Sequence, residues 1–297
     1  MLGLIVLLQT LIVAVSGPPT SPEYLPLRVA TAEGHFAREG LDVRLRTTRA
    51  ESGAAEALAQ GQADLVATTL EAMLRFGPRE SRQHPSLVFG LTAAPPCALV
   101  VGAPHAAEVR SVEDLPGLRV GVATPGAPEH AWFGWLLARA GISVAQLHVV
   151  SLGARGLVAA LDAGEIHAGL AYEPAATQLL QEGRAKLIAD FRTPAAVTAA
   201  LGAATVNAAV FARVDRRPND AVLARMARAL LAATVRIRTA SRDIYLSDGL
   251  VSAEQIRQTV LIVRSHTPLP AALRIPEAER LLHLEPLRSA LRAPARR

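Results

Sequence analysis

Short apolar segments alternate along the chain with segments whose apolar residues recur every three or four positions. The first kind predicts buried β-strands, and the second predicts helices that bury one face. Because the two kinds follow one another through most of the sequence, we expect an α/β fold. The predicted strands are residues 10–16, 41–45, 64–67, 87–91, 98–102, 119–123, 147–150, 166–171, 186–190 and 206–212. The predicted helices are residues 24–38, 52–60, 69–76, 128–140, 154–163, 174–182, a stretch from 218, 252–264 and 276–292.

The amino-terminal segment MLGLIVLLQTLIVAV is almost wholly apolar and supports two interpretations. A secretory signal would have a small-x-small cleavage site at residues 14–16, although the first basic residue is Arg28. A first buried strand over residues 10–16 would end in the Gly-Pro-Pro turn at residues 17–19. We expect the strand, with residues 1–8 as a shortened export signal.

Two blocks of sequence recur at nearly constant spacing. Residues 57–65 match residues 160–168 at an offset of 103, and residues 37–43 match residues 138–144 at an offset of 101. Each copy is predicted to run helix, glycine turn, strand, loop, helix, glycine and strand. This repeat predicts two similar lobes, each with a mostly parallel sheet flanked by helices.

The repeat also predicts where a ligand binds, because ligands of open parallel sheets lie beyond the carboxyl ends of the strands. Thr69 in the first lobe and Tyr172 in the second occupy equivalent positions. Two such edges facing each other would form a binding cleft. The candidate ligand-binding residues are Thr20, Ser21, Tyr24, Thr68, Thr69, Thr124, Gly126, Ala127, His130, Tyr172 and Glu173.

The chemistry of these candidates suits a small polar or flat molecule. The free N–H groups at the start of helix 128–140 suit an anionic or carbonyl group, and two tyrosines can clamp a flat ligand. Each candidate also has a purely structural interpretation. Thr68 and Thr69 can cap a helix, Glu173 can be the acid of a first helical turn, and His130 can lie on the surface.

Composition narrows the class of function. The chain is 51% hydrophobic and 19% charged, which is typical of a folded globular protein. Its net charge is +5, but the arginines are scattered among 26 acidic residues, so we expect no nucleic-acid binding. The single cysteine, Cys97, excludes an intramolecular disulfide and a cysteine-cluster metal site. We expect no metal and no cofactor.

Several segments, taken in order, resemble the solute-binding proteins of ABC importers, in particular the binders of aliphatic sulfonates, taurine, nitrate and thiamine-pyrimidine precursors. The likeness covers residues 10–215, with Tyr172 where this family usually has Trp. The segments are PEYLPL (22–27), GHF (34–36), EGLDV (39–43), GQAD (61–64), DLPGLRVGV (114–122), TPGAPEH (124–130) and YEPAA (172–176).

The resemblance implies a two-lobed type II periplasmic-binding fold. Lobe 1 would comprise residues 1–95 and 205–297 and lobe 2 residues 96–204, with hinges near 95–101 and 204–210. A monomer of this kind would work in the periplasm or otherwise outside the cytoplasmic membrane. By hinge closure it would capture a sulfonate, a nitrate-like anion or an aminopyrimidine, and would deliver it to an ABC permease and its ATPase.

The alternative is an enzyme of the same fold that acts on a small ring compound, of the pyrimidine-synthesis or dehydratase/lyase type. The sequence lacks the Gly-x-Ser-x-Gly and His-Glu-x-x-His motifs and a phosphate-binding P-loop. Cys97 has apolar neighbours, which favours a buried and inert thiol. We therefore expect a binding protein and not an enzyme.

Overall fold

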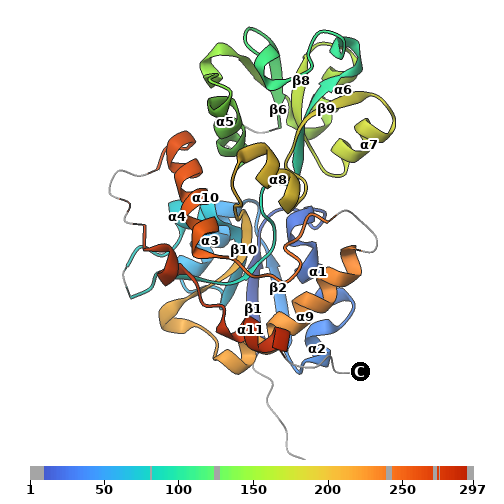
Figure 1. Ribbon diagram of the computed structural model, residues 1–297. Coiled ribbons are helices and arrows are strands. Elements are labelled where there is room, and N and C mark those ends of the chain that lie inside the picture. The colour runs from blue at the N-terminus through green and yellow to red at the C-terminus, as the bar shows by residue number, and fades with distance from the viewer. Residues whose placement is uncertain are drawn as a thin grey trace, which may run out of the picture. The chain divides into compact units, whose positions relative to one another are not determined.

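The computed structural model describes residues 10–80, 82–123, 128–238, 243–269, 273 and 275–292, and these divide into two units (Figure 1). Unit 1 comprises the described residues of Met1–Leu91, Ala208–Ala253 and Pro270–Arg297. Unit 2 comprises those of Thr92–Asn207 and Glu254–Leu269. The expectations for residues 1–8 and for Thr124, Gly126 and Ala127 lie outside the described residues.

Unit 1 is built on a five-stranded sheet of order β2-β1-β3-β10-β4. β1 pairs in parallel with β2 and β3, whereas β10 runs antiparallel to β3 and β4. Four strands therefore point the same way and one is reversed. The bounds are β1 (Thr10–Val15), β2 (Asp42–Thr47), β3 (Leu65–Thr69), β4 (Pro85–Gly90) and β10 (Ala208–Arg213).

Unit 2 has a second five-stranded sheet, of order β7-β6-β8-β5-β9, with the same pattern of directions. β6 is parallel to β7 and β8, and β5 is the reversed strand between β8 and β9. The two sheets match strand for strand, which confirms the prediction of two similar α/β halves. The bounds are β5 (Cys97–Gly102), β6 (Arg119–Val122), β7 (His148–Ser151), β8 (Ala168–Tyr172) and β9 (Ala185–Asp190).

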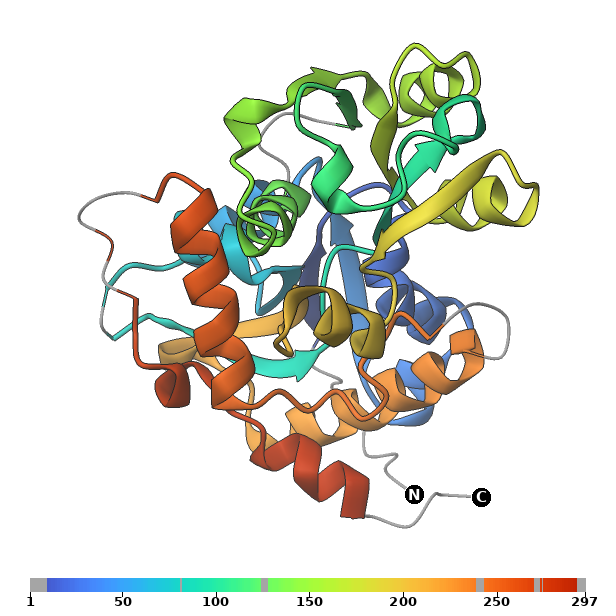
Figure 2. The same ribbon diagram turned by 45° about the horizontal axis from the view of Figure 1, so that its top comes forward.

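Helices flank both sheets, and within the first unit the amino-terminal and carboxyl-terminal helices α1 and α11 both pack on α9 (Figure 1). In unit 2, α10 lies beside α5 (Figure 2). The His266 ring of α10 meets the Trp135 ring of α5 edge-on. The helices of unit 1 are α1 (Leu25–Ala32), α2 (His35–Arg38), α3 (Glu51–Ala59), α4 (Leu70–Phe76), α9 (Asp220–Arg238) and α11 (Glu285–Arg292). Those of unit 2 are α5 (Glu129–Arg139), α6 (Gly153–Asp162), α7 (Ala175–Gln181), α8 (Pro194–Leu201) and α10 (Ala253–His266).

Short 3₁₀ helices complete the backbone, and several element boundaries differ from the predictions. The helix expected over residues 24–38 is broken, because Gly34 has a φ of +71° between α1 and α2. The expected helix 276–292 is also two pieces, and α8 was not predicted. α3 begins one residue earlier than the predicted helix 52–60, and its N-cap is Ala50. The 3₁₀ helices are Pro22–Tyr24, Ala103–His105, Val112–Asp114, Val144–Gln146, Val214–Arg216 and Ala278–Leu281.

Four strands are buried along their whole length. They are the inner strands β3, β10 and β5 and the edge strand β4, and this burial is expected where other elements cover both faces of the sheet. Aliphatic residues fill most of this core, and Trp132 is its largest fully buried side chain. Within the described residues, no helix has both the length and the apolar character needed to cross a membrane.

Candidate functional site

The first group of candidate residues lies at the carboxyl edge of the sheet in unit 1. Ser16 directly follows β1, and Thr68 and Thr69 end β3. The reversed strand β10 begins at this same edge, because its first residue, Ala208, pairs with Thr69. Asn207, which precedes β10, therefore also stands at the edge.

Thr68 and Thr69 help to hold this edge together. The Thr69 hydroxyl accepts a hydrogen bond from the N–H of Ala72 at 3.1 Å and caps α4. The Thr68 hydroxyl donates to the carbonyl oxygen of Glu51 at 2.9 Å, which ties β3 to the start of α3. Both side chains are buried, and the capping interpretation holds for the contacts of Thr69 but not for those of Thr68.

The hydroxyls of Tyr24 and Ser16 are also buried, but they differ from those of Thr68 and Thr69 in their hydrogen bonding. Tyr24 is 1% exposed and Ser16 is 0% exposed, yet neither hydroxyl has a hydrogen-bond partner in the described structure. The hydroxyls of Ser16 and Thr68 lie near the phenol without meeting hydrogen-bond geometry. Burial, followed by the charges of Glu51 and Glu23, raises the pKa of Tyr24 well above its usual value. The phenol is therefore neutral and can donate a hydrogen bond.

Arg28 brings a positive charge to the same edge. Its guanidinium donates long hydrogen bonds to the carbonyl oxygens of Gly17 at 3.3 Å and Pro18 at 3.4 Å, and to the Thr47 hydroxyl at 3.4 Å. Its Nε is buried and has no partner among the described residues, and burial lowers the pKa of Arg28. The guanidinium thus spans the carboxyl ends of β1 and β2 with weak bonds.

The loop after β1 is shaped by Gly17. Its φ is +69°, and a Cβ at this position would lie 2.4 Å from the Ser21 hydroxyl oxygen, so only glycine suits the turn. Ser21 is half-buried, whereas Thr20 is exposed. Of these two predicted ligand-binding residues, only Ser21 is partly shielded from solvent.

The second group lies at the carboxyl edge of the sheet in unit 2, around Tyr172. The Tyr172 hydroxyl donates a hydrogen bond of 2.7 Å to Oε2 of Glu129, a fully buried residue in the first turn of α5. A carboxylate is favourable at a helix N-terminus, where the helix dipole is positive. His130 follows it and is half-buried, and burial lowers the pKa of its imidazole. Trp132 is fully buried, and its indole N–H has no partner in the described residues.

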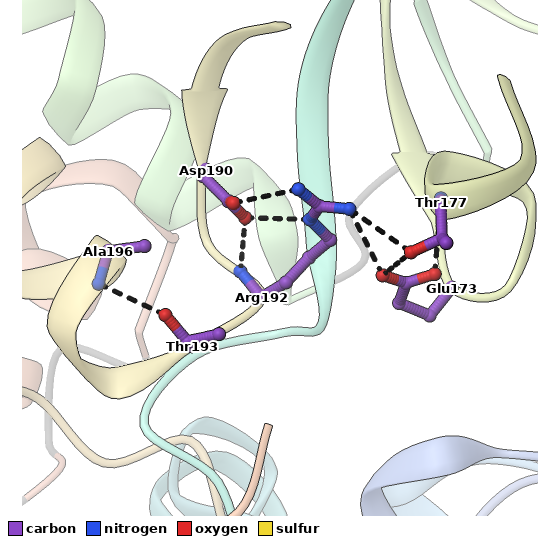
Figure 3. A network of polar contacts seen from close by, with 6 residues as sticks. All are labelled: Glu173, Thr177, Asp190, Arg192, Thr193 and Ala196. Atoms are coloured by element: carbon purple, nitrogen blue, oxygen red, sulfur yellow. Dashed lines mark hydrogen bonds and ion pairs between the residues drawn. The ribbon is translucent and has the colours of Figure 1, made fainter. Parts of the chain in front are cut away.

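Glu173 belongs to a buried network centred on Arg192 (Figure 3). Its carboxylate accepts hydrogen bonds from the Thr177 hydroxyl at 2.6 Å and from Arg192 at 3.4 Å. Arg192, 3% exposed, also donates two hydrogen bonds of 2.8 Å to the carboxylate of Asp190. The bond with Asp190 raises the pKa of Arg192. Glu173 thus holds the start of α7 in place through partners inside unit 2.

The structure therefore gathers most of the described candidates at the two edges, Thr20 being the exposed exception. It adds residues that the sequence analysis did not single out as ligand contacts. Ser16 could have been found from its place at the carboxyl end of the predicted strand 10–16. The others depend on long-range pairing, which no local pattern reveals. The added residues are Ser16, Arg28, Glu129, Trp132, Arg192 and Asn207.

Cys97 begins the reversed strand β5 and therefore also stands at the carboxyl edge of unit 2. Cys97 is fully buried on β5, where it pairs with Tyr172 on β8. Among the described residues, no three His, Cys, Asp or Glu side chains are grouped so that they could hold a metal ion. The chemistry of both edges thus rests on hydroxyls, carboxylates, an indole, an imidazole, an amide, arginines and one buried thiol.

Comparison with solved structures places this fold among periplasmic binding proteins. The periplasmic sulfonate-binding protein SsuA of Methylobacillus flagellatus KT matches with a TM-score of 0.73 and 16% identity, over 96% of this chain and 94% of that one. SsuA of Xanthomonas axonopodis pv. citri, bound to MOPS, matches with a TM-score of 0.64 and 16% identity, over 93% and 98%. A DszB variant in complex with biphenyl-2-sulfinic acid matches with a TM-score of 0.60 and 15% identity, over 94% and 98%.

Sequence comparison identifies the family. Among curated proteins, none is similar enough to this chain to match. The family model described as "NMT1/THI5 like" matches residues 21–207, which is more than half of the chain. The two-unit α/β fold agrees with this match, and so does the series of sequence motifs from PEYLPL to YEPAA that was quoted above. The chain therefore belongs to the NMT1/THI5-like family.

Proposed function

We propose that this protein is the solute-binding component of an ABC importer and that it holds a small organic molecule at the carboxyl edges of its two sheets. One observation carries the proposal. Buried polar atoms without a partner are rare in folded proteins, because each costs free energy. In the described structure, such atoms belong to residues that lie at these edges or on helices that begin there. These residues are Ser16, Tyr24, Arg28, Trp132 and Asn207.

A bound ligand would supply the missing hydrogen-bond partners. In unit 1, the hydroxyls of Ser16 and Tyr24 and the Arg28 guanidinium would contact an acceptor group. In unit 2, the indole N–H of Trp132 would do the same, while Tyr172 and His130 would border the ligand. A sulfonate, a nitrate-like anion or an aminopyrimidine would fit this chemistry. Ligand contacts to both units would favour their closure, which the permease would recognise.

Two features support a transport role over catalysis. SsuA, among the similar structures, is a sulfonate-binding protein, and the form from Xanthomonas holds MOPS. The thiol of Cys97 is fully buried in the described structure, which shields it from a bound solute. We therefore propose capture without chemical change, outside the cytoplasmic membrane, in partnership with a permease and its ATPase.

A thermal-shift screen with mass spectrometry of the recovered ligand tests this proposal. The panel would contain MOPS, taurine, nitrate and 4-amino-5-hydroxymethyl-2-methylpyrimidine. A ligand at 100 times its Kd should raise stability by about 2.7 kcal/mol and be recovered unchanged. The double variant Ser16→Ala/Tyr24→Phe should keep the fold and lose most of the shift. Conversion of the ligand with turnover would show an enzyme, and the absence of any shift would contradict binding of these classes.

A further inference from the structure

The segment that crosses from unit 2 into β10 is held tightly by hydrogen bonds. The Thr205 hydroxyl donates to the carbonyl oxygen of Ala93 at 2.6 Å, and the N–H of Val206 donates to the Thr259 hydroxyl at 2.9 Å. The N–H of Asn207 donates to the carbonyl oxygen of Thr92 at 2.8 Å. These hydrogen bonds therefore fix the chain at residues 205–207.

The side chain of Asn207 contrasts with this satisfied backbone. Asn207 is 1% exposed, and neither its Oδ1 nor its Nδ2 has a hydrogen-bond partner in the described structure. A primary amide offers two donors and one acceptor, so burying it without partners is costly. Because an apolar side chain of similar size would avoid that cost, the amide at this position calls for an explanation outside the packing of the protein.

The position of Asn207 in the fold supplies an explanation for its buried amide. The next residue, Ala208, pairs with Thr69 at the end of β3, and β10 is the reversed strand of its sheet. Asn207 therefore stands at the carboxyl edge to which we assign the ligand. We propose that Asn207 is a ligand-recognition residue whose amide donates one hydrogen bond to the bound molecule and accepts another from it.

This inference rests on the proposed function and sharpens its ligand class. An amide is fully satisfied by a group that presents an acceptor and a donor side by side, as carboxamides, lactams and amino-substituted nitrogen rings do. A sulfonate or nitrate only accepts hydrogen bonds, so it would satisfy Nδ2 and leave Oδ1 without a partner. Asn207 thus favours donor–acceptor ligands over simple oxyanions.

The test compares Asn207→Leu with the wild-type chain by isothermal titration against two sets of probes. Nicotinamide, cytosine and 2-pyrrolidone present a donor and an acceptor, whereas MOPS and nitrate present acceptors alone. We expect at least one probe of the first set to bind the wild type, and Asn207→Leu to weaken it at least tenfold. The melting temperature of the ligand-free variant should equal or exceed that of the wild type, because an unsatisfied buried amide has been removed.

Asn219, the other asparagine of the chain, is a matched control. Its Oδ1 accepts a hydrogen bond of 3.0 Å from the N–H of Val222 at the start of α9, so its amide has a structural partner. Asn219→Leu should lower the melting temperature and leave probe affinity unchanged.

Three results would overturn the inference. The first is a melting temperature for ligand-free Asn207→Leu that falls as far as that of Asn219→Leu, since Asn207 would then have a structural role. The second is equal affinity of wild type and Asn207→Leu for a donor–acceptor probe. The third is a wild type that binds no donor–acceptor probe. If MOPS or nitrate still binds in that case, the proposed function stands without Asn207, and if no probe of either set binds, both fail.

Discussion

The carboxyl edges of the two sheets occupy the same place in two matching topologies, yet their side chains are satisfied differently. Thr69 and Tyr172 end the equivalent strands β3 and β8. In unit 2, the Tyr172 hydroxyl bonds to the buried carboxylate of Glu129, and Glu173 bonds to Thr177 and Arg192. In unit 1, the hydroxyls of Ser16 and Tyr24 have no partner in the described structure. The repeat therefore determines where polar residues stand but not what they bond to.

This difference predicts different consequences of mutation. In unit 2, the polar groups bonded to Glu129 and Arg192 hold one another in place, so removing one should cost stability and leave charges buried without partners. In unit 1, the hydroxyls of Ser16 and Tyr24 make no hydrogen bond in the described structure. Removing them should therefore cost ligand affinity instead of stability. Both tryptophans, Trp132 and Trp135, belong to unit 2, so tryptophan fluorescence reports the unfolding of that unit.

The largest effect is expected for Arg192→Met. This change leaves the carboxylates of Asp190 and Glu173 without their buried cation, and breaking a buried ion pair typically costs about 3–5 kcal/mol. Urea unfolding followed by tryptophan fluorescence would measure it. The control is Arg184→Met, because Arg184 makes comparable ion pairs with Asp162 and Glu182 on the surface. Equal midpoints for the two variants would contradict the structural role of the network.

The next effect separates the two edges directly, through Tyr172→Phe and Tyr24→Phe. Each change removes one phenolic hydroxyl, that of the half-buried Tyr172 or that of the buried Tyr24. Tyr172→Phe takes a donor from the buried carboxylate of Glu129 and should cost about 1–3 kcal/mol of unfolding free energy. Tyr24→Phe removes a hydroxyl without a partner, so it should leave stability unchanged or raise it, and weaken a ligand about threefold to tenfold. A loss of stability in Tyr24→Phe equal to that in Tyr172→Phe would remove the distinction between the edges.

Local sequence patterns predicted the elements of both units well, because the buried strands differ clearly from the amphipathic helices. The repeat around Gly61 and Gly164 also predicted the equivalence of Thr69 and Tyr172. The network around Arg192 was not predicted, since Arg192 and Glu173 lie nineteen positions apart and meet only in the fold. The part played by Asn207 was hidden for a similar reason: its place at the edge depends on the reversal of β10.

A smaller effect tests whether Thr69 serves only as a helix cap. Thr69→Ala removes the hydroxyl that caps α4, and Thr193→Ala removes the equivalent cap of α8, where the hydroxyl accepts from the N–H of Ala196 at 3.2 Å. Each should cost about 1 kcal/mol of unfolding free energy. We expect Thr69→Ala also to weaken the ligand, because Thr69 lies at the proposed site. Unchanged affinity in both variants would restrict Thr69 to the cap.

The smallest effect concerns the pH dependence of unit 2. The pKa of His167 is lowered from its ordinary value of 6.5, mainly by burial and then by His105, whose ring centroid lies 4.3 Å away. Its Nδ1 accepts the N–H of Arg119 at 3.3 Å, a bond that protonation of Nδ1 would break. The carboxylate of Glu108 opposes this shift of the His167 pKa.

Below about pH 6.5, the unfolded chain therefore takes up a proton at His167 before the folded chain does, and the folded state loses stability as the pH falls. His167→Gln should flatten this decline between pH 7.5 and pH 5.5 without abolishing it, because the pKa values of His130 and His266 are lowered as well. Urea midpoints from tryptophan fluorescence at both pH values would measure the difference in slope. Parallel declines in the variant and the wild type would mean that the His105–His167 pair contributes nothing to the acid sensitivity of unit 2.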